Sequence, residues 1–202
     1  YLFSTNLAEL LVIAATVILL LPLPLTPAQI VWLNLVTDSF LVIALVFMPR
    51  DEDVMRENDT ERSPYILDLK TTLRLILFGI IMTAGTLWVF FHYQSMSTTI
   101  HAQTMAFLTL SLYQLFRLWS VRSKRKSAFG DSPFKYPWLL GASILMVILQ
   151  VVAIHVPFMN RILDTTPLSI GDWALAAGVG FTIVIVDEVR KYIVRKKHRH
   201  MT

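Results

Sequence analysis

The sequence predicts an all-α fold, a polytopic membrane protein built as a bundle of six transmembrane helices. Of the 202 residues 55% are hydrophobic and the mean hydropathy is +0.59, which is too apolar for an ordinary soluble domain. Six apolar runs are long enough, or nearly long enough, to cross a bilayer. Lys and Arg gather at the ends of these runs, as topology determinants do, so the net charge of +4 does not indicate nucleic-acid binding.

The first two runs, 2–21 and 27–48, are predicted to form a helical hairpin. The short linker between them contains three prolines, at positions 22, 24 and 27. Proline ends one helix and is favoured at the start of the next, so we expect a tight turn here.

The other four runs are separated by polar loops. The stretch 49–68 is the most charged part of the chain and precedes the third run, and a basic stretch follows the fourth. A loop containing Asn160, Arg161 and Asp164 leads to the last run, and a basic tail follows it. These predicted spans are 73–92, 103–121, 137–157 and 173–189.

The distribution of basic residues predicts which side each loop faces. Six spans place the loop 49–68, the segment 122–136 and the tail on the same side. Of the 18 Lys and Arg residues, all but Arg161 lie on or near that side. The positive-inside rule therefore predicts that the loop 49–68 and the C-terminal tail are cytosolic. We expect a multi-pass integral membrane protein of the plasma membrane.

Two carboxylates fall inside these apolar runs, Glu9 and Asp38. An aspartate at the bilayer centre costs roughly 2.5–3.5 kcal/mol on insertion scales, so such a residue indicates a functional site. Asn34 and Thr37 precede Asp38 at helical spacing, and Asn6 precedes Glu9 by three residues, which on an α-helix puts each set on one face. Two carboxylates, two amides and a hydroxyl are oxygen ligands that suit a hard cation.

The two carboxylates are also predicted to lie at similar depth. Glu9 is 13 residues before Pro22, and Asp38 is 11 residues after Pro27. At a rise of ~1.5 Å per residue they lie roughly 20 and 16 Å from the outer turn. In a hydrocarbon core about 30 Å thick, both positions are near the middle.

The chain ends and the cysteine content add two expectations. There is no cysteine, which excludes disulfides and thiolate metal sites. The sequence opens inside an apolar segment, at Tyr1, without an initiating Met. We therefore expect it to be a piece of a longer protein.

The segments that carry the two carboxylates resemble a known family. Tyr1–Glu9 and Trp32–Asp38 look like the fifth and sixth transmembrane helices of type II P-type cation-transporting ATPases, and the calcium pumps are the nearest match. Asp51–Met55 resembles the loop after the sixth helix, and Asp187–Lys191 resembles the end of the tenth. The resemblance implies that residues 1–202 are the C-terminal transmembrane domain of such a pump, helices five to ten.

The resemblance also implies the ion ligands and the partners. Its ion-ligand positions are occupied here by Asn6, Glu9, Asn34, Thr37 and Asp38. The cargo is expected to be calcium, with manganese as the alternative, because both ions take oxygen ligands. The other partners are membrane lipid and the N-terminal portion of the same pump. ATP and magnesium would act only through catalytic domains that, like the first four helices, this sequence does not contain. The chain alone is therefore not expected to hydrolyse ATP.

The sequence departs from the family pattern in two places. Gln114 stands where reticulum-type calcium pumps carry a glutamate, so it offers an oxygen without a charge. Because Glu9 and Asp38 together balance one divalent ion, we expect one high-affinity cation per pump. Ser39-Phe40-Leu41 replaces the usual Gly and Pro after Asp38, so the resemblance does not fix how far the second helix unwinds around the ion.

Other functions and residue roles stay open at this stage. A non-catalytic six-helix scaffold and a passive cation channel are the alternatives, although no Gly-rich filter segment supports a channel. The loop 49–68 is either a coupling contact for catalytic domains or a plain solvated linker. Arg117 is expected to extend toward the cytosol. Asp187 and Glu188 are expected to form an interfacial charge cluster with Arg190 and Lys191.

Overall fold

The computed structural model describes residues 1–47, 69–121 and 135–199. The predicted coupling loop 49–68 lies outside these residues, as does most of the segment 122–136. Throughout the described ranges the regular structure is helical, without a strand, which confirms the all-α class. The elements are α1 (Leu2–Ile18), α2 (Pro27–Trp32), η1 (Leu33–Asp38), α3 (Ser39–Val46), α4 (Leu69–Met96), α5 (Thr99–Val121), α6 (Pro137–His155), α7 (Pro157–Leu163) and α8 (Ile170–Arg199).

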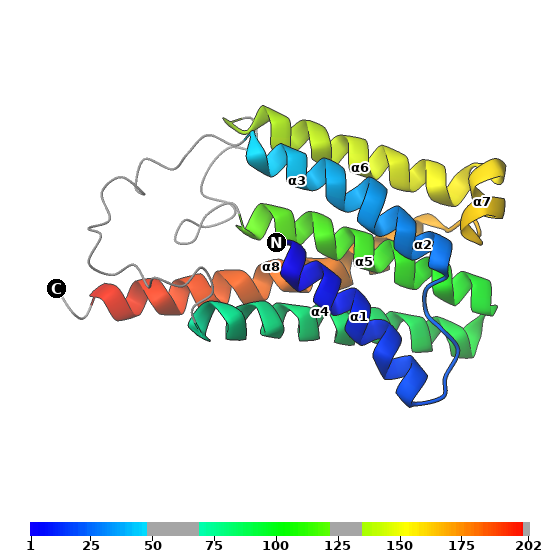
Figure 1. The fold of residues 1–202 in the computed structure, drawn as a ribbon, viewed down its shortest axis with the longest axis horizontal. Coiled ribbons are helices and arrows are strands. Elements are labelled where there is room, and N and C mark those ends of the chain that lie inside the picture. The colour runs from blue at the N-terminus through cyan, green and yellow to red at the C-terminus, as the bar shows by residue number, and fades with distance from the viewer. Residues whose placement is uncertain (48–68, 122–134, 200–202) are drawn as a thin grey trace.

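The long helices run along one common direction and form a bundle (Figure 1). The elements α2, η1 and α3 join into a single rod, because Leu33 and Ser39 at the junctions keep right-handed helical backbone angles. α3 and α5 end where α4 and α6 begin, at the end of the bundle from which α8 projects (Figure 1). The chain therefore alternates in direction along the bundle, as expected for a polytopic membrane protein.

Four helical stretches are long and apolar enough to cross a membrane: Pro27–Val46, Thr71–Met96, Pro137–His155 and Ile170–Ile193. These stretches overlap four of the six predicted spans. α1 is shorter, at 17 residues. α5 has the length but not the apolarity, because it carries Thr104, Gln114 and Arg117 among its apolar residues.

α5 is the central helix of the bundle. It packs against α4 and α8, and also against α6, α3 and η1. Most of its residues are buried, including Phe107, Leu108 and Tyr113. The hydrophobic core is continuous through α5 and includes residues of every long helix in the described ranges.

The connection between the first two helical stretches differs from the predicted tight turn. α1 ends at Ile18, and Leu20 adopts a left-handed backbone with φ 52°. The N–H of Leu21 then bonds to the carbonyl of Thr16 at 2.9 Å, a pairing that closes the helix end. The chain continues to Thr26 before helix resumes, so α1 packs on α4 while α3 packs on α6.

The second stretch begins with a capping box. The Thr26 hydroxyl accepts a bond from the Gln29 N–H at 3.3 Å, and the Gln29 side-chain oxygen accepts one from the Thr26 N–H at 3.1 Å. This arrangement satisfies two donors at the start of α2. Gln29 also donates to the carbonyl of Leu163 at 3.0 Å. That bond ties α2 to the end of α7, a short helix that the sequence analysis took for a loop.

Candidate cation site

Glu9 on α1 joins three elements through its two carboxylate oxygens. Its side chain is buried, with 5% exposure. Asn34 on η1 donates to Oε2 at 2.6 Å, and Gln114 on α5 donates to Oε1 at 3.0 Å. Three of the six residues that the sequence singled out therefore meet at one buried carboxylate.

Asp38 is held by donors from α1. It is 2% exposed at the end of η1. The Tyr1 hydroxyl donates to Oδ1 at 2.9 Å and the Thr5 hydroxyl donates to Oδ2 at 3.3 Å. The sequence analysis missed both donors. The signal was available, because Tyr1 and Thr5 precede Glu9 at intervals of four residues and so share its helix face.

The two carboxylates lie on neighbouring levels of an antiparallel helix pair. Thr5 on α1 meets Asp38, and one turn along α1 Glu9 meets Asn34, which comes four residues earlier in the chain than Asp38. Four residues of α-helix rise about 6 Å, so the two contacts are about one turn apart. The segment of α1 supplies Glu9 and two donors for Asp38, and η1 supplies Asp38 and one donor for Glu9.

The stretch that carries Asn34 and Asp38 is a π-helix, not the α-helix that the spacing argument assumed. A π-helix bonds i to i+5, so residues three apart no longer share a face as they do on an α-helix. Asn34 is accordingly exposed, whereas Thr37 and Asp38 are 3% and 2% exposed. The backbone remains helical through Ser39, so η1 is a widened turn and not an unwound segment. Such π segments are frequent at functional sites.

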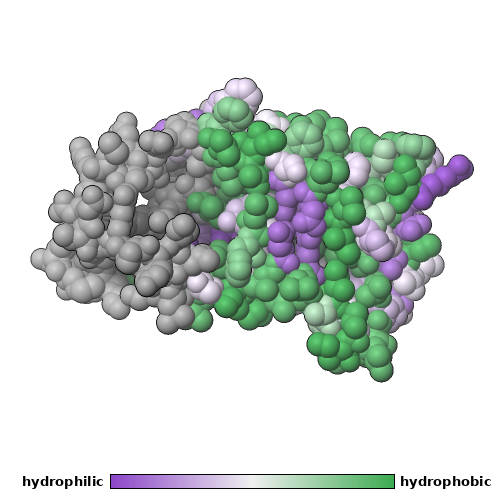
Figure 2. Space-filling model, in the orientation of Figure 1, coloured by the Kyte–Doolittle hydropathy of each residue, from purple (hydrophilic) through white to green (hydrophobic). Residues whose placement is uncertain are grey.

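Asn6 does not join the contacts of Glu9 or Asp38. It is exposed on α1, and within the described residues no hydrogen bond engages its side chain. Figure 2 shows a hydrophilic patch in the middle of the face, with mostly apolar residues on either side of it. α1 and η1 expose two amides, Asn6 and Asn34, and α3 exposes the hydroxyl residue Ser39.

Gln114 offers an oxygen next to Glu9. The Gln114 side chain is fully buried, and its Oε1 has no hydrogen-bond partner in the described part of the chain. A buried carbonyl oxygen without a donor is unfavourable unless a ligand or water engages it. The same residues 1–47, 69–121 and 135–199 contain no cluster of three or more His, Cys, Asp or Glu. The oxygen donors gathered here are two carboxylates and neutral amide and hydroxyl groups, a set whose chemistry would suit a hard cation.

Two other predicted charge placements can be compared with the structure. Arg117 does not extend toward solvent: it is 3% exposed, and its guanidinium carbon lies 4.1 Å from the ring centre of Phe78. Asp187 does pair with Arg190 and Lys191, each at 2.8 Å. This cluster is more buried than an interfacial one, since Asp187 and Lys191 are 2% and 1% exposed.

Comparison with known proteins places the chain in a family. The family described as "Cation transporting ATPase, C-terminus" matches residues 22–193. A calcium-transporting ATPase of Bacillus subtilis is 33% identical over 89% of this chain and 20% of its own length. An endoplasmic reticulum-type calcium-transporting ATPase of Arabidopsis thaliana is 26% identical over 96% of this chain and 22% of its own length. A probable cation-transporting ATPase F of Mycobacterium tuberculosis is 30% identical over 90% and 20%.

The chain spans about a fifth of the length of these relatives. The match to the family covers most of the described helices, from the connection after α1 to near the end of α8. The relatives and the apolar helices agree in indicating the membrane part of an ion-transporting protein. The chain therefore belongs to the cation-transporting ATPase family, as a C-terminal membrane domain of the calcium-pump-like kind.

Proposed function

We propose that this chain is the membrane-embedded ion-binding part of an ATP-driven divalent cation transporter, and that calcium is the transported ion. The observation that carries the proposal is the Glu9 carboxylate, which contacts Asn34 on η1 and Gln114 on α5. The relatives named as calcium-transporting ATPases support calcium over manganese. The proposed ligands are Asn6, Glu9, Asn34, Thr37, Asp38 and Gln114. In this proposal residues 1–202 form one domain, and ATP and magnesium act through a catalytic portion outside it.

The amide side chains can serve this function in two orientations. Asn34 and Gln114 present N–H groups to Glu9, and rotating each amide by half a turn presents its oxygen instead. Without a cation, these N–H groups stabilise the Glu9 carboxylate by hydrogen bonds, and a bound cation would take over that role. The hydroxyl groups of Thr5 and Tyr1 stabilise Asp38 in the same way. A transporter must bind and release its ion, and donors that can replace the ion lower the cost of release.

The charge of the proposed site favours one divalent ion. Glu9 and Asp38 are its two carboxylates, and Gln114 adds no charge. Calcium takes six to eight oxygens. The six proposed side chains supply six oxygens if each binds through one, and a bidentate carboxylate or water would supply any seventh or eighth. A second divalent ion would lack a counter-charge among these ligands.

Equilibrium binding of radioactive calcium to the full-length protein tests the ligands and the stoichiometry. We expect one calcium per molecule, and no high-affinity binding in Asp38→Asn, because a neutral amide cannot balance the ion. Asp172→Asn is the matched control, since that carboxylate bonds to Tyr93 and Ser169 far along the bundle. Gln114→Glu is expected to raise the stoichiometry toward two. Two calcium ions per wild-type molecule, or undiminished binding in Asp38→Asn, would refute the proposed site. Competition by manganese in the same assay separates the two candidate ions.

The proposal includes six membrane spans, formed by α1, the α2–η1–α3 rod, α4, α5, α6 and α8. In this proposal the protein spans the plasma membrane, and the loop 49–68 and the C-terminal tail lie on its cytosolic side. Met96 is at the end of α4 that lies farthest from the loop 49–68. A cysteine introduced by Met96→Cys should therefore react with an impermeant thiol reagent from outside intact cells. Asp59→Cys, in the segment outside the described residues, should react only after permeabilisation. The reverse pattern would contradict the proposed orientation.

A further inference from the structure

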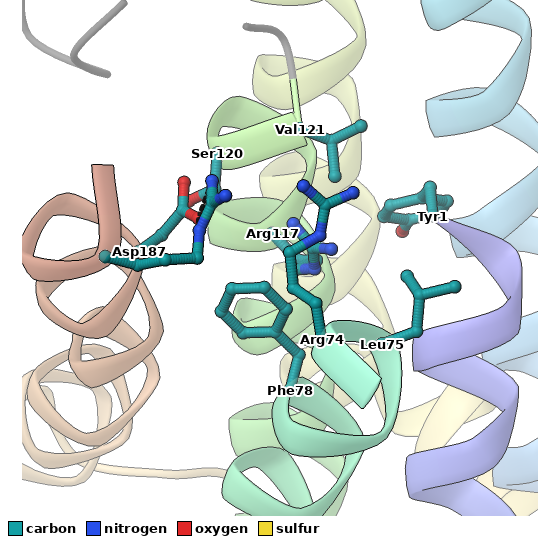
Figure 3. Close-up of a pocket in the computed structure, with 9 residues that line it drawn as sticks. Tyr1, Arg74, Leu75, Phe78, Arg117, Ser120, Val121 and Asp187 are labelled. Atoms are coloured by element: carbon teal, nitrogen blue, oxygen red, sulfur yellow. Dashed lines mark hydrogen bonds and ion pairs between the residues drawn. The ribbon is translucent and has the colours of Figure 1, made fainter. Parts of the chain in front are cut away.

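A polar cavity lies at the end of the bundle where α4 begins and α5 ends. It holds about 100 Å³ and is lined mainly by α4, α5 and α8, with Tyr1 at its edge. Its polar lining consists of three arginines, one aspartate, one serine and one tyrosine: Arg74, Arg117, Arg190, Asp187, Ser120 and Tyr1. In Figure 3 the side chains of Arg74 and Arg117 extend into the space between Asp187 and Tyr1.

The charges of this cavity do not cancel. Asp187 is its only lining carboxylate among the described residues, and both of its oxygens are already engaged. Arg190 donates to Oδ1 at 2.9 Å through Nε, and Lys191 contacts Oδ2 at 2.8 Å. Arg74 and Arg117 have no carboxylate within ion-pair distance in the described ranges. Among the described residues, the cavity therefore holds two guanidinium groups without an ion-pair partner.

Arg117 is the more deeply buried of these two arginines. It is 3% exposed, and its Nε has no hydrogen-bond partner within the described helices; the Nε of Arg74 is in the same condition. The ring of Phe78 covers one face of the Arg117 guanidinium. A buried charged donor without an acceptor is costly, so these groups fit a site whose acceptor comes from a ligand.

We propose that this cavity binds an oxyanion of the phosphate class, supplied by the headgroup of an anionic lipid or by a free phosphate ester. Two arginines that converge from neighbouring helices present planar, multiple N–H donors, which match the oxygens of a phosphate. The cavity lies near the start of α4 and the end of α5, so an anionic headgroup that enters the bundle from this end can reach it. Tyr1 lines the cavity and also donates to Asp38, so the bound anion would adjoin the proposed cation site without being part of it.

Two probes distinguish the two sources of the anion in the full-length protein. The soluble probe is radiolabelled glycerol 3-phosphate, measured by equilibrium dialysis in neutral detergent. The lipid probe is phosphatidic acid mixed with phosphatidylcholine in nanodiscs, with the retained lipid identified by mass spectrometry. Binding of both probes, or of the lipid alone, assigns the cavity to a lipid headgroup. Binding of the soluble probe alone assigns it to a free phosphate ester. Binding of neither probe overturns the proposal.

Variants test whether the binding takes place in this cavity. Arg74→Gln and Arg117→Gln should each weaken binding about tenfold or more, because each removes a charge-assisted hydrogen bond. Arg161→Gln changes an exposed residue on α7 and should leave binding unchanged. Asp187→Asn removes the negative charge from the lining and should strengthen binding, an effect that structural damage cannot imitate. Equal binding by wild type, Arg74→Gln and Arg117→Gln, without a gain in Asp187→Asn, would overturn the assignment.

Discussion

Gly85 on α4 is the position at which a single methyl group should do the most damage to the packing around α5. A Cβ at this position would lie 2.0 Å from the hydroxyl oxygen of Tyr113, and 2.9 and 3.0 Å from its Cζ and Cε2 atoms. Tyr113 is 1% exposed and its hydroxyl hydrogen-bonds to Thr182 at 3.1 Å. The ring is enclosed, so α4 and α5 must separate or the bond to Thr182 on α8 must break.

The expected effect of Gly85→Ala follows from these distances. Overpacking of a filled core costs about 1–3 kcal/mol, and loss of the Tyr113–Thr182 bond adds about 0.5–1.5 kcal/mol. The better helix propensity of alanine returns up to about 1 kcal/mol. We therefore expect a net loss of about 1–3 kcal/mol in the free energy of unfolding, measured by chemical denaturation in mixed detergent micelles. Because Gln114 follows Tyr113, the shift of α5 should also weaken calcium binding.

A control variant and a double-mutant cycle test whether Gly85 packs against Tyr113 in this way. Gly178→Ala on α8 places its methyl group in open space, with no atom within 4 Å, and should not destabilise. Tyr113→Phe deletes the colliding oxygen, so Gly85→Ala should cost less in that background, with a coupling of about 1 kcal/mol or more. Stability of Gly85→Ala equal to wild type, or strictly additive effects with Tyr113→Phe, would show that the helices are not packed as described.

Two further predictions concern the connection between α1 and α2. Leu20 is 93% exposed and has φ 52°, so Leu20→Gly should stabilise by about 1 kcal/mol by relieving left-handed strain, whereas Leu19→Gly should not; equal effects in thermal unfolding would contradict this. Thr26→Ala should destabilise by about 1 kcal/mol through loss of the capping box, and Thr26→Ser, which keeps the hydroxyl, should restore most of the loss. A Thr26→Ser variant as unstable as Thr26→Ala would point to the methyl group instead.

Much of the architecture could be predicted from apolar runs and proline positions, but the helix ends could not. α1 stops at Ile18, inside the apolar run, because Leu20 turns left-handed and the chain closes on Thr16. Apolar composition carries no signal for that backbone change. α4 continues to Met96, beyond its apolar run, where the Tyr93 hydroxyl donates to Asp172 at 2.7 Å. The short helix α7 had one unused signal, the Pro157 that begins it.

The candidate site could be predicted in its residue types but not in its pairings. Isolated carboxylates in apolar runs identified Glu9 and Asp38, because burial of an unpaired charge is costly. The π-helical register of η1 was not predictable from α-helical spacing, and it separates Asn34 from Thr37 in exposure. The contacts of Thr5 and Gln114 depend on how α1 crosses its neighbours, which is a property of the tertiary packing and not of either helix alone.

α5 shows why apolarity alone does not identify the helices of such a bundle. A helix that faces lipid must be apolar on the lipid side, whereas a helix enclosed by other helices can carry polar residues if protein groups face them. α5 is enclosed by α4, α6 and α8, and it carries Thr104, Gln114 and Arg117. Its modest apolarity is therefore a consequence of its central position. That same position brings Gln114 to Glu9 and Arg117 to the polar cavity, so a long helix that lacks the apolarity of a spanning helix contributes to both candidate sites.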